Sequence, residues 1–541
     1  MTTEGDHTIG RWLRDRASAD PHRVAIDDRG VLVDYATLYA RASSLADTLG
    51  GAGYGSGARI CTVSGNSVDH VVAFFACALL GAAFVPLSWR LTPAELAELL
   101  RRSRADLVLI EEEHSSLASE ALRLFASGAS ASTALPRCAP LGSVGIEQQA
   151  PRALFVRERR APQSDDPLLV IYTSGSEAAP KGVVLTHASC FWNNLALSQA
   201  MPMSRDDVVL AILPQHHVAA WNVQPLLAWW VGATVVLERS FQPERALQLI
   251  QERRVTTVMG VPTQYRMLLD VPHLDRFDLS SLRRVVVGGA TTPRDLAESW
   301  AARGVHLTQG YGLTEAAPNV LFLRPEDLPA NPEAIGRPYP TVDTCIVDPD
   351  SGLVLEGAAA GELWVRGPSL FAGYLDDDEA TERAMSDGWL RTGDLVARDA
   401  HGVHRVIDRL KNIYVSGGEN VAPAEVEFAL TAHPLVEEAS VVAVPDPVWG
   451  ERGFAFVVTR EPLSADELLA FARTRIASFK LPARVEFVAE LPRSTIEKVA
   501  RTRLQDLAMK LCGVAEVGTQ HNAQTLVDPA QNPKTKGKAH A

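Results

Sequence analysis

The chain has 541 residues, which predicts about three or four structural units rather than one core. Its apolar content of 46%, charged content of 22% and mean hydropathy of zero are typical of a globular protein. No run reaches the roughly 18 uninterrupted apolar residues of a membrane-spanning helix. The net charge of −13 argues against a nucleic-acid partner.

The six cysteines are spread over the chain with no C-x-x-C pair, which indicates neither a zinc site nor a disulfide framework. Residues 1–20 are polar and amphipathic, without the apolar stretch of a signal peptide. We therefore expect a cytoplasmic protein with no membrane span.

Short apolar runs alternate with helical periodicity in the first 90 residues. Residues 24–33 predict a β-hairpin, and residues 35–50 have the apolar spacing of a helix. Apolar strands are expected at 60–63 and 83–87, on either side of a helix over 67–80. This alternation of strand, helix and strand is typical of a parallel α/β sheet.

The same alternation continues further along the chain. Thr92 and Glu95 predict a capping box at the start of the next helix. A helix is expected over about 188–200, with strands at 234–237 and 255–259.

Residues 111–166 differ from their surroundings because they are rich in Ala, Ser and Pro. Part of this segment, SGASAS at 127–132, is close to low complexity. We interpret 111–166 as a surface linker or variable insert.

The stretch YTSGSEAAPKG, residues 172–182, lies between two apolar strands and has the composition of a phosphate-binding loop. Hydroxyl donors, a glycine and a lysine occupy Thr173, Ser174, Gly175, Ser176 and Lys181. Glycine lets backbone N–H groups approach an anion, and lysine supplies a point charge. The spacing is not that of a Walker A motif, and an ordinary Ser/Gly/Pro loop is the alternative.

Two glycine-rich segments follow buried strands. Gly288, Gly289 and Ala290 come directly after the strand 285–287, so a flat group could lie against that backbone; a tight turn is the alternative. The second segment is QGYGLTE, residues 309–315, which places an aromatic ring between glycines, then a hydroxyl and a carboxylate. A ring, hydroxyl and carboxylate suit a base, a phosphate and magnesium, and a glycine-rich helix cap is the alternative.

Asp394 ends the motif WLRTGD, where its carboxylate could accept both hydroxyls of a ribose; a turn aspartate is the alternative. A separate small α/β unit is expected after the charged residues 408–412 and extends to about residue 504. Residues 516–541 are polar and without periodicity, which predicts disorder.

Eight motifs, taken in their order along the chain, resemble those of the adenylate-forming superfamily. They are YTSGSEAAPKG, HHVAAWN, VVVGGA, QGYGLTE, GELWVRG, WLRTGD, DRLKNIYVSGGENVAPAEVE and LPRSTIEK. The resemblance covers about residues 10–505. HHVAAWN and GLTEAAPNVLF are more similar to acyl-CoA and fatty-acid CoA ligases than to amino-acid-activating domains.

The resemblance implies an α/β fold in which residues 1–408 form a large domain of α/β subdomains with a distorted β-barrel. Residues 409–411 would be a hinge, and residues 412–515 a small mobile α+β domain. ATP and a carboxylic acid would give an acyl-adenylate and pyrophosphate, with Mg²⁺ bound, and coenzyme A would then displace AMP. We expect a monomer or homodimer.

The resemblance also implies roles for individual residues. Those of the nucleotide site would be Thr173, Ser174, Gly175, Ser176 and Lys181 at the β and γ phosphates; Gly288, Gly289, Ala290 and Tyr311 at the adenine; Thr314 at the α phosphate; Asp394 and Arg409 at the ribose; and Glu315 at the metal. Gln309, Gly310, Gly312 and Lys498 would also contact ATP or AMP. The acyl group would meet His217, Trp221, Asn222, Gly288 and Gly310. Lys411 would be the hinge residue, Gly417 and Gly418 would line the coenzyme A passage, and Lys498, His217 and Lys181 would be catalytic.

Several positions depart from the common family pattern. Glu177 and Ala178 replace a hydroxyl and a glycine in the phosphate loop, and Glu497 replaces the glycine before Lys498. Gln215 and His216 replace an apolar pair before His217, which affects specificity rather than reaction type.

The acyl segment carries no acidic residue placed to pair with an amino group, which favours a hydrophobic carboxylic acid, either medium-chain aliphatic, aryl or polycyclic. Trp221 is expected at the pocket wall, and Trp229 and Trp230 are expected in the core.

Three functions follow from the sequence. The first is a carboxylate–CoA ligase of fatty-acid or secondary metabolism. The second makes the same adenylate but passes the acyl group to an acyl carrier protein or an amine. The third is a sensor of nucleotide or acyl-adenylate that has lost catalysis, which Glu177 and Glu497 favour but Lys181, Glu315, Asp394 and Lys498 oppose.

Overall fold

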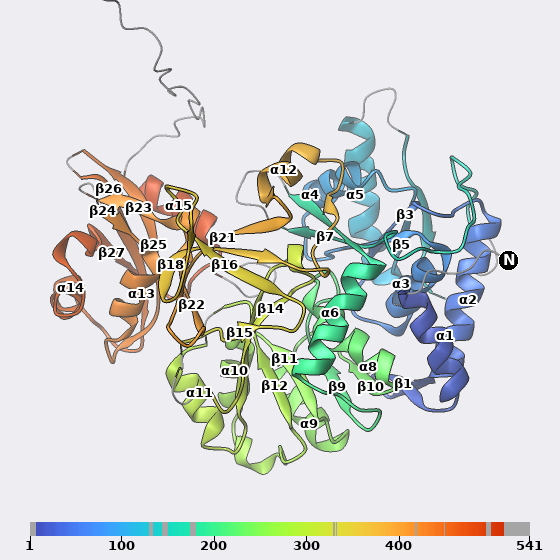
Figure 1. Ribbon diagram of the computed structural model, residues 1–541, viewed down its shortest axis with the longest axis horizontal. Coiled ribbons are helices and arrows are strands. Elements are labelled where there is room, and N and C mark those ends of the chain that lie inside the picture. Colours follow the sequence, from blue (N-terminus) through green and yellow to red (C-terminus); the bar gives the residue numbers. More distant parts are fainter. Residues whose placement is uncertain are drawn as a thin grey trace, which may run out of the picture.

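The computed structural model describes residues 7–128, 134–142, 150–173, 180–290, 292–327, 331, 333–416, 419–447, 449–493 and 499–512. It has a large N-terminal domain with three sheets and a smaller C-terminal domain with a fourth (Figure 1). The tail at 516–541, predicted to be disordered, lies outside the described residues. Within the described residues, no helix combines the length and the apolar character that crossing a membrane requires.

The first sheet has nine strands in the order β15-β14-β13-β12-β11-β9-β10-β1-β2. Their bounds are β1 Val24–Asp28, β2 Val31–Asp34, β9 Val208–Ala211, β10 Thr234–Leu237, β11 Thr257–Gly260, β12 Arg284–Val287, β13 Leu307–Gly312, β14 Asn319–Leu323 and β15 Arg337–Pro338. The central strands β1, β10, β9, β11, β12 and β13 are parallel. The predicted hairpin β1–β2 and the strands at 234–237 and 255–259 are confirmed, apart from small shifts at their ends.

The second sheet has seven strands in the order β19-β8-β7-β4-β3-β5-β6. Their bounds are β3 Arg59–Val63, β4 Ala83–Leu87, β5 Leu107–Ile110, β6 Arg137–Pro140, β7 Pro167–Thr173, β8 Lys181–Thr186 and β19 Gly373–Tyr374. The helix α4 (Pro93–Ser103) begins with the predicted capping box, in which Thr92 and Glu95 each accept from the other's backbone N–H.

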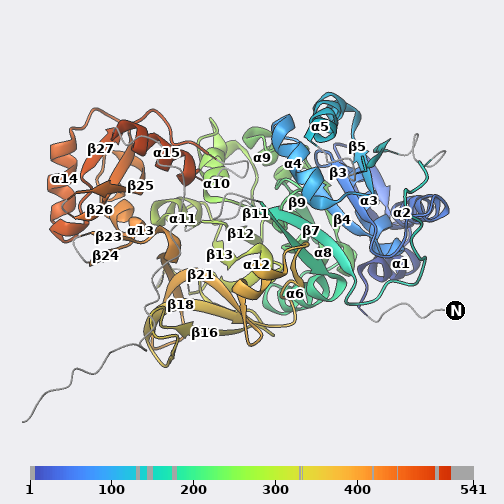
Figure 2. The same ribbon diagram turned by 90° about the horizontal axis from the view of Figure 1, so that it is seen from above.

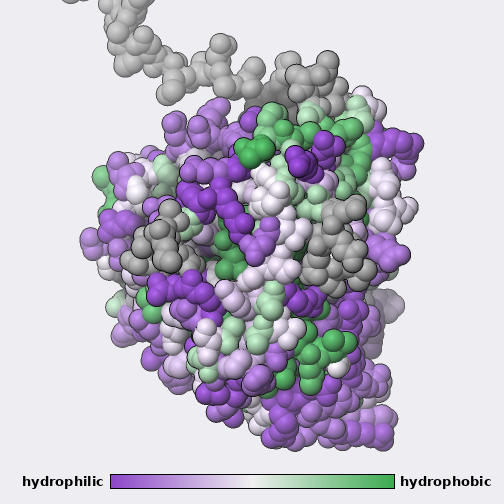
Figure 3. All heavy atoms as spheres, turned by 90° about the vertical axis from the view of Figure 1, so that its right-hand side faces the viewer, coloured by the Kyte–Doolittle hydropathy of each residue, from purple (hydrophilic) through white to green (hydrophobic). Residues whose placement is uncertain are grey.

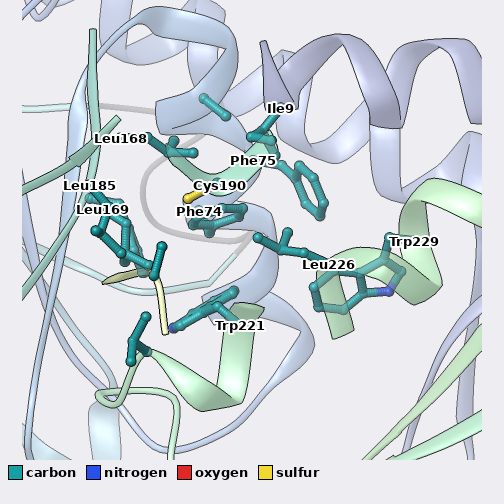
Figure 4. Close-up of a cluster of buried hydrophobic side chains, with 14 of the residues drawn as sticks. Ile9, Phe74, Phe75, Leu168, Leu169, Leu185, Cys190, Trp221, Leu226 and Trp229 are labelled. Atoms are coloured by element: carbon teal, nitrogen blue, oxygen red, sulfur yellow. The ribbon is translucent and has the colours of Figure 1, made fainter. Parts of the chain in front are cut away.

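Helices separate and cover these two sheets. They are α1 Ile9–Ala19, α2 Tyr35–Gly51, α3 Val68–Leu80, α6 His187–Ala200, α7 Ala219–Asn222, α8 Pro225–Val231, α9 Pro243–Glu252, α10 Pro262–Leu269 and α11 Arg294–Ala301. The largest core cluster takes side chains from α3, α7 and α8 and from the strands β7 and β8 (Figure 4). The two sheets therefore share one core around α3.

The interpretation of residues 111–166 as a linker is wrong for part of that segment. It contains the helix α5 (Ser115–Gly128), which packs on α4, and the strand β6, which extends the second sheet. Ala118, Ala121 and Phe125 are buried there. They recur at helical spacing, but the Ala-, Ser- and Pro-rich composition of the whole segment favoured the linker interpretation.

The third sheet is a half-barrel in the order β17-β16-β18-β21-β20, with β22 also paired to β21. Its bounds are β16 Asp343–Val347, β17 Val354–Leu355, β18 Ala359–Arg366, β20 Met385–Ser386, β21 Trp389–Arg398 and β22 His404–Arg409; the helix α12 spans Asp378–Ala384. Figure 2 shows the half-barrel on one side of the two larger sheets.

The C-terminal domain packs helices on an antiparallel sheet in the order β24-β23-β26-β25, with β27 paired to β26. Its bounds are β23 Tyr414–Ser416, β24 Glu419–Val421, β25 Val436–Asp446, β26 Gly450–Thr459, β27 Arg484–Phe487, α13 Pro423–Thr431, α14 Ala465–Arg473 and α15 Arg501–Leu511. This domain lies at one end of the molecule (Figures 1 and 2). The opposite end presents a mostly hydrophilic face with separate apolar patches (Figure 3).

Candidate functional site

The two ends of the predicted phosphate loop are held by an antiparallel hairpin. Thr173 at the end of β7 pairs with Lys181 at the start of β8. The ammonium of Lys181 lies 5.2 Å from the centre of the Tyr374 ring, on β19 beside β8. Ser174, Gly175 and Ser176 lie outside the described residues. The pairing of β7 with β8 therefore fixes the positions at which the predicted phosphate loop leaves and rejoins the sheet.

Glu315 is joined to the same place by Tyr374. The phenol of Tyr374 donates a hydrogen bond of 2.9 Å to Oε1 of Glu315, and the backbone N–H of Phe371 donates to the Glu315 carbonyl. Tyr374 thus lies between Lys181 and Glu315, which are 134 residues apart in sequence. The predicted metal residue and the predicted phosphate residue are brought together.

The donor set around Glu315 suits a hard cation held mainly by its substrate. A carboxylate oxygen is a ligand that Mg²⁺ prefers. The described residues contain no cluster of three or more His, Cys, Asp or Glu side chains able to hold a metal by themselves. A magnesium ion at Glu315 would therefore complete its coordination with phosphate oxygens and water, as is usual for nucleotide-bound magnesium.

The glycine segments form one ledge at the ends of β12 and β13. Gly289 has φ of +82°, which favours glycine, and a Cβ at Gly288 would lie 3.3 Å from the carbonyl oxygen of Gly310. The amide of Gln309 donates to the carbonyls of Ala290 and Gly310 at 3.2 and 3.1 Å. Gln309 therefore fastens the loop after β12 to β13, which leaves flat backbone exposed at the ledge.

Gly312 is required for a steric reason. A Cβ at Gly312 would lie 1.5 Å from the carbonyl oxygen of Pro318, where no side chain fits. The register of β13 against β14 shifts between Tyr311 and Gly312, and the turn Thr314–Ala316 follows. Glycine at 312 thus lets the chain double back and places Glu315.

Asp394 and Arg409 face each other across β21 and β22 and form an ion pair. The phenol of Tyr311 donates to the other oxygen of Asp394 at 2.5 Å, and the Asp394 side chain is nearly buried. Burial and the Asp394 carboxylate raise the pKa of Tyr311 well above its usual value, so its proton stays in place as a donor. The predicted base and ribose residues therefore share one hydrogen-bonded group.

Lys411 lies next to this group, in the turn Leu410–Asn412 that leads to the C-terminal domain. Burial, together with the charge of Arg409, lowers the pKa of Lys411. The Asp408 carboxylate accepts from the side chain of Asn412 and from the backbone N–H of Ala424, at the start of α13. Asp408 thus joins the end of the large domain to the first helix of the small one.

This arrangement occurs in a chain that matches two family models. Residues 13–375 match the AMP-binding enzyme and residues 425–498 match the AMP-binding enzyme C-terminal domain. The chain belongs to the AMP-binding enzyme family.

Curated relatives match over almost their full length. Feruloyl-CoA synthase from Amycolatopsis sp is 38% identical over 495 residues, which are 91% of this chain and 97% of the relative. Indoleacetate–CoA ligase from Aromatoleum aromaticum is 33% identical, over 93% of this chain and 98% of the relative. The fatty acid–acyl-carrier-protein ligase ScoC from Streptomyces coeruleorubidus is 33% identical, covering 91% and 94%.

Solved structures give the same fold. ATP-bound MatB from Rhodopseudomonas palustris superposes with a TM-score of 0.84 at 28% identity, over 94% of this chain and all of that one. The complex of O-succinylbenzoate coenzyme A synthetase from Bacillus subtilis with ATP and magnesium has a TM-score of 0.81 at 29% identity, over 92% and 99%. An amide bond synthetase from Marinactinospora thermotolerans has a TM-score of 0.81 at 29% sequence identity, over 93% of this chain and 99% of that one.

Two of the acyl-site expectations for this AMP-binding enzyme are not supported. Trp221 is completely buried: it stacks on Phe74 with ring centres 4.6 Å apart, and its indole N–H donates to the Gln215 carbonyl at 2.7 Å. Figure 4 places Trp221 in the core beside Phe74. Asn222 is also fully buried, and its amide contacts Asn194 and Cys190. Both side chains pack inward because α7 presses that face onto α3 and α6.

His217 is only partly buried, although its Nε2 atom is buried, and its ring centre lies 4.3 Å from that of His216. His216 is buried, and burial together with the neighbouring His217 lowers its pKa well below the usual value. His216 is therefore neutral at pH 7. The predicted core positions of Trp229 and Trp230 agree with their packing, since Trp229 is buried and Trp230 stacks on Trp12.

A network of buried asparagine side chains was not predicted from the sequence. The amide oxygen of Asn193 accepts from the side chain and backbone N–H of Asn319, and its nitrogen donates to the Asn222 carbonyl at 2.8 Å. The network ties α6 and α7 to the start of β14, directly after the Glu315 turn. The available signal was the adjacent pair Asn193 and Asn194 inside a predicted helix, where asparagine is a poor helix former.

Lys498, Gly417 and Gly418 lie outside the described residues. Their roles remain predictions from the resemblance to this family.

Proposed function

We propose that this AMP-binding enzyme is a carboxylate–CoA ligase. It would join ATP and a hydrophobic carboxylic acid into an acyl-adenylate, with release of pyrophosphate, and would then transfer the acyl group to the thiol of coenzyme A with release of AMP. The observation that carries the proposal is the contact chain Lys181–Tyr374–Glu315, which brings a cation and the carboxylate predicted to bind metal to one place. Relatives named as CoA ligases match this chain over more than nine-tenths of its length.

The first half-reaction joins two anions, so positive charge near the attacked phosphate gives the largest assistance. Lys181 would hold the β and γ phosphates, and Glu315 would hold magnesium against them. Lys498 would come from the small domain to the carboxylate and the α phosphate. Mg²⁺, when bound, would neutralise charge on the departing pyrophosphate.

The nucleoside would rest on the glycine ledge at Gly288, Gly289 and Gly310. Asp394 is positioned to accept the ribose hydroxyls because Tyr311 and Arg409 already fix its two oxygens. Binding of the ribose would then need little rearrangement, which lowers the entropy cost of binding.

For the second half-reaction we propose that residues 1–408 and 412–515 move as two bodies about a hinge at 409–411. Lys411 lies in a short turn between two domains, where a change of backbone angles can rotate one against the other. The Arg493 side chain contacts Thr263 of α10 across this boundary at 3.4 Å, and the rotation would break that contact. Gly417 and Gly418 would line the passage for coenzyme A.

The acid is proposed to be an apolar or aryl carboxylic acid. The relatives named feruloyl-CoA synthase and indoleacetate–CoA ligase act, by name, on aryl acids.

The second candidate acceptor is an acyl carrier protein or an amine. It is favoured by the similarity to an acyl-carrier-protein ligase and to an amide bond synthetase.

The test is ATP–pyrophosphate exchange over a panel of aliphatic, hydroxycinnamic and indolic acids, with polar amino acids as controls. Exchange with apolar or aryl acids, followed by a coenzyme A thioester in the mass spectrum, is the expected result. Exchange without a thioester would move the acceptor to a carrier protein or amine. Exchange with polar amino acids alone would refute the proposed acid class.

A further inference from the structure

A cavity of about 350 Å³ lies beside the base of the phosphate hairpin, between the end of α4, the start of β8 and the turn after β19. Its charged lining residues come from two segments and from Lys181. The cations are Arg101, Arg102, Arg104 and Lys181, and the acids are Glu98, Asp376 and Asp377. Four cations thus face three acids in one hollow.

The acids of the cavity are already engaged. Glu98 accepts from both Arg101 and Arg102, at 3.0 and 2.8 Å, so two cations share one carboxylate. Asp376 is held by both terminal nitrogens of Arg59, at 2.7 and 2.9 Å. Hydrogen bonding by Arg59 lowers the pKa of Asp376, so this carboxylate stays charged.

The remaining acid has a structural role. Asp377 accepts from the backbone N–H of Ala380 and thereby caps α12. Arg104 approaches Asp376 only to 3.5 Å, and 74% of its side chain is exposed. Arg101 and Arg102 share Glu98, and Arg59 and Arg104 share Asp376, so positive charge exceeds negative charge around Arg102 and Arg104.

The cavity is next to the proposed reaction site. Tyr374 lines it, carries the Lys181 ammonium over its ring and donates to Glu315. The cavity therefore adjoins the Lys181–Tyr374–Glu315 contact chain. The volume is large enough for a small phosphate anion, and guanidinium groups bind phosphate oxygens with two donors each.

We infer that this cavity binds the pyrophosphate released in the first half-reaction, with Arg102 in the last turn of α4 and Arg104 directly after that helix as its ligands. The inference rests on the proposed function. The phosphates of coenzyme A have the same chemistry, so the test separates the two sources. Holding pyrophosphate here would separate it from the adenylate on the enzyme and favour the bound adenylate over bound ATP, with the overall equilibrium unchanged.

The test uses the full-length enzyme and the double variant Arg102→Gln/Arg104→Gln. The matched control is Arg123→Gln on α5, which removes another exposed arginine with an intrahelical glutamate partner, away from the cavity. The KM for pyrophosphate in the exchange reaction is expected to rise about 3- to 10-fold in the double variant, with the KM values for ATP and acid changed less than about 2-fold. The control is expected to match the wild type.

Two further readouts make the result decisive. Calorimetric titration of the enzyme with magnesium pyrophosphate is expected to show weaker binding in the double variant, with a smaller loss at higher salt than in the wild type. Arg102→Lys/Arg104→Lys is expected to restore part of the affinity, because charge is kept while paired donation is lost.

Three results would overturn the inference. An unchanged pyrophosphate KM would show that the arginines do not hold pyrophosphate. Equal increases for ATP and pyrophosphate would show that they act only on the fold of the hairpin. A rise confined to the KM for coenzyme A would assign the cavity to that substrate. If no acid supports exchange in the wild type, the proposed function fails, whereas the calorimetric titration still decides the pyrophosphate site by itself.

Discussion

Replacing Trp221 by alanine tests whether this side chain belongs to the core or to the acyl pocket. In the structure its exposed fraction is zero, and three rings surround it: Phe74 at 4.6 Å, Phe84 at 5.6 Å and His70 at 5.7 Å between ring centres. Its indole N–H donates to the Gln215 carbonyl, which joins α7 to the segment before it. Truncation would leave a cavity at the junction of both large sheets.

The size of the effect follows from burial and from the hydrogen bond. Trp→Ala in a core costs about 3–5 kcal/mol, and the lost hydrogen bond adds about 1 kcal/mol. The free energy of unfolding of the large domain should therefore fall by about 4–6 kcal/mol. Trp221→Phe keeps most of the ring contact and should cost about 1–3 kcal/mol.

The assay is urea unfolding followed by circular dichroism and by activity. Trp449→Ala is the stability control, because 41% of that side chain is exposed, and its loss should be below about 1 kcal/mol. A Trp221→Ala enzyme that keeps wild-type stability but changes its preference among acids would refute the reasoning. It would place the indole at the pocket wall, as the sequence predicted.

Three further predictions concern acidity, sterics and catalysis. Burial lowers the pKa of His70 and His187 to about 4, below the unfolded value of 6.5, so the unfolded chain binds more protons. Each histidine should therefore contribute about 3 kcal/mol of stability that is present above pH 6.5 and lost as the pH falls towards 4. When the unfolding free energy is measured over this pH range, His187→Asn should lower its slope against pH by the equivalent of one proton. Gly312→Ala should lower the unfolding free energy by more than about 3 kcal/mol, measured in urea, because its Cβ would overlap the Pro318 carbonyl; wild-type stability would contradict this. Lys498→Ala should abolish adenylate formation while a presynthesised acyl-adenylate is still converted to thioester, and equal loss of both half-reactions would contradict its assignment.

Several local features could be predicted because their causes are local. The hairpin at 24–33 and the alternating elements that follow depend on apolar periodicity over a few residues. The capping box at Thr92 and Glu95 depends on a three-residue spacing. The glycines of the ledge could be identified from the sequence because they directly follow apolar strands and carry no side chain.

Other features depended on contacts that no short window contains. Tyr374 joins Lys181 to Glu315 only because β19 pairs with β8 and the 314–316 turn folds back onto it. The helix in the 111–166 segment packs a few apolar side chains against α4, but the Ala-, Ser- and Pro-rich composition of the segment as a whole is that of a loop. Its sequence alone therefore suggested a linker.

By itself, the sequence determined the types of group available for the proposed chemistry: a loop of hydroxyl residues, glycine and one lysine, glycine backbone after two strands, and the carboxylates Asp394 and Glu315. The tertiary structure decided which of them meet and which side chains face away. Trp221 and Asn222 have suitable chemistry for an acyl pocket, but packing of α7 onto α3 and α6 turns them into the core. The physical reason is that burial and long-range hydrogen bonds are properties of the packed whole, whereas periodicity and capping act between neighbours in the chain.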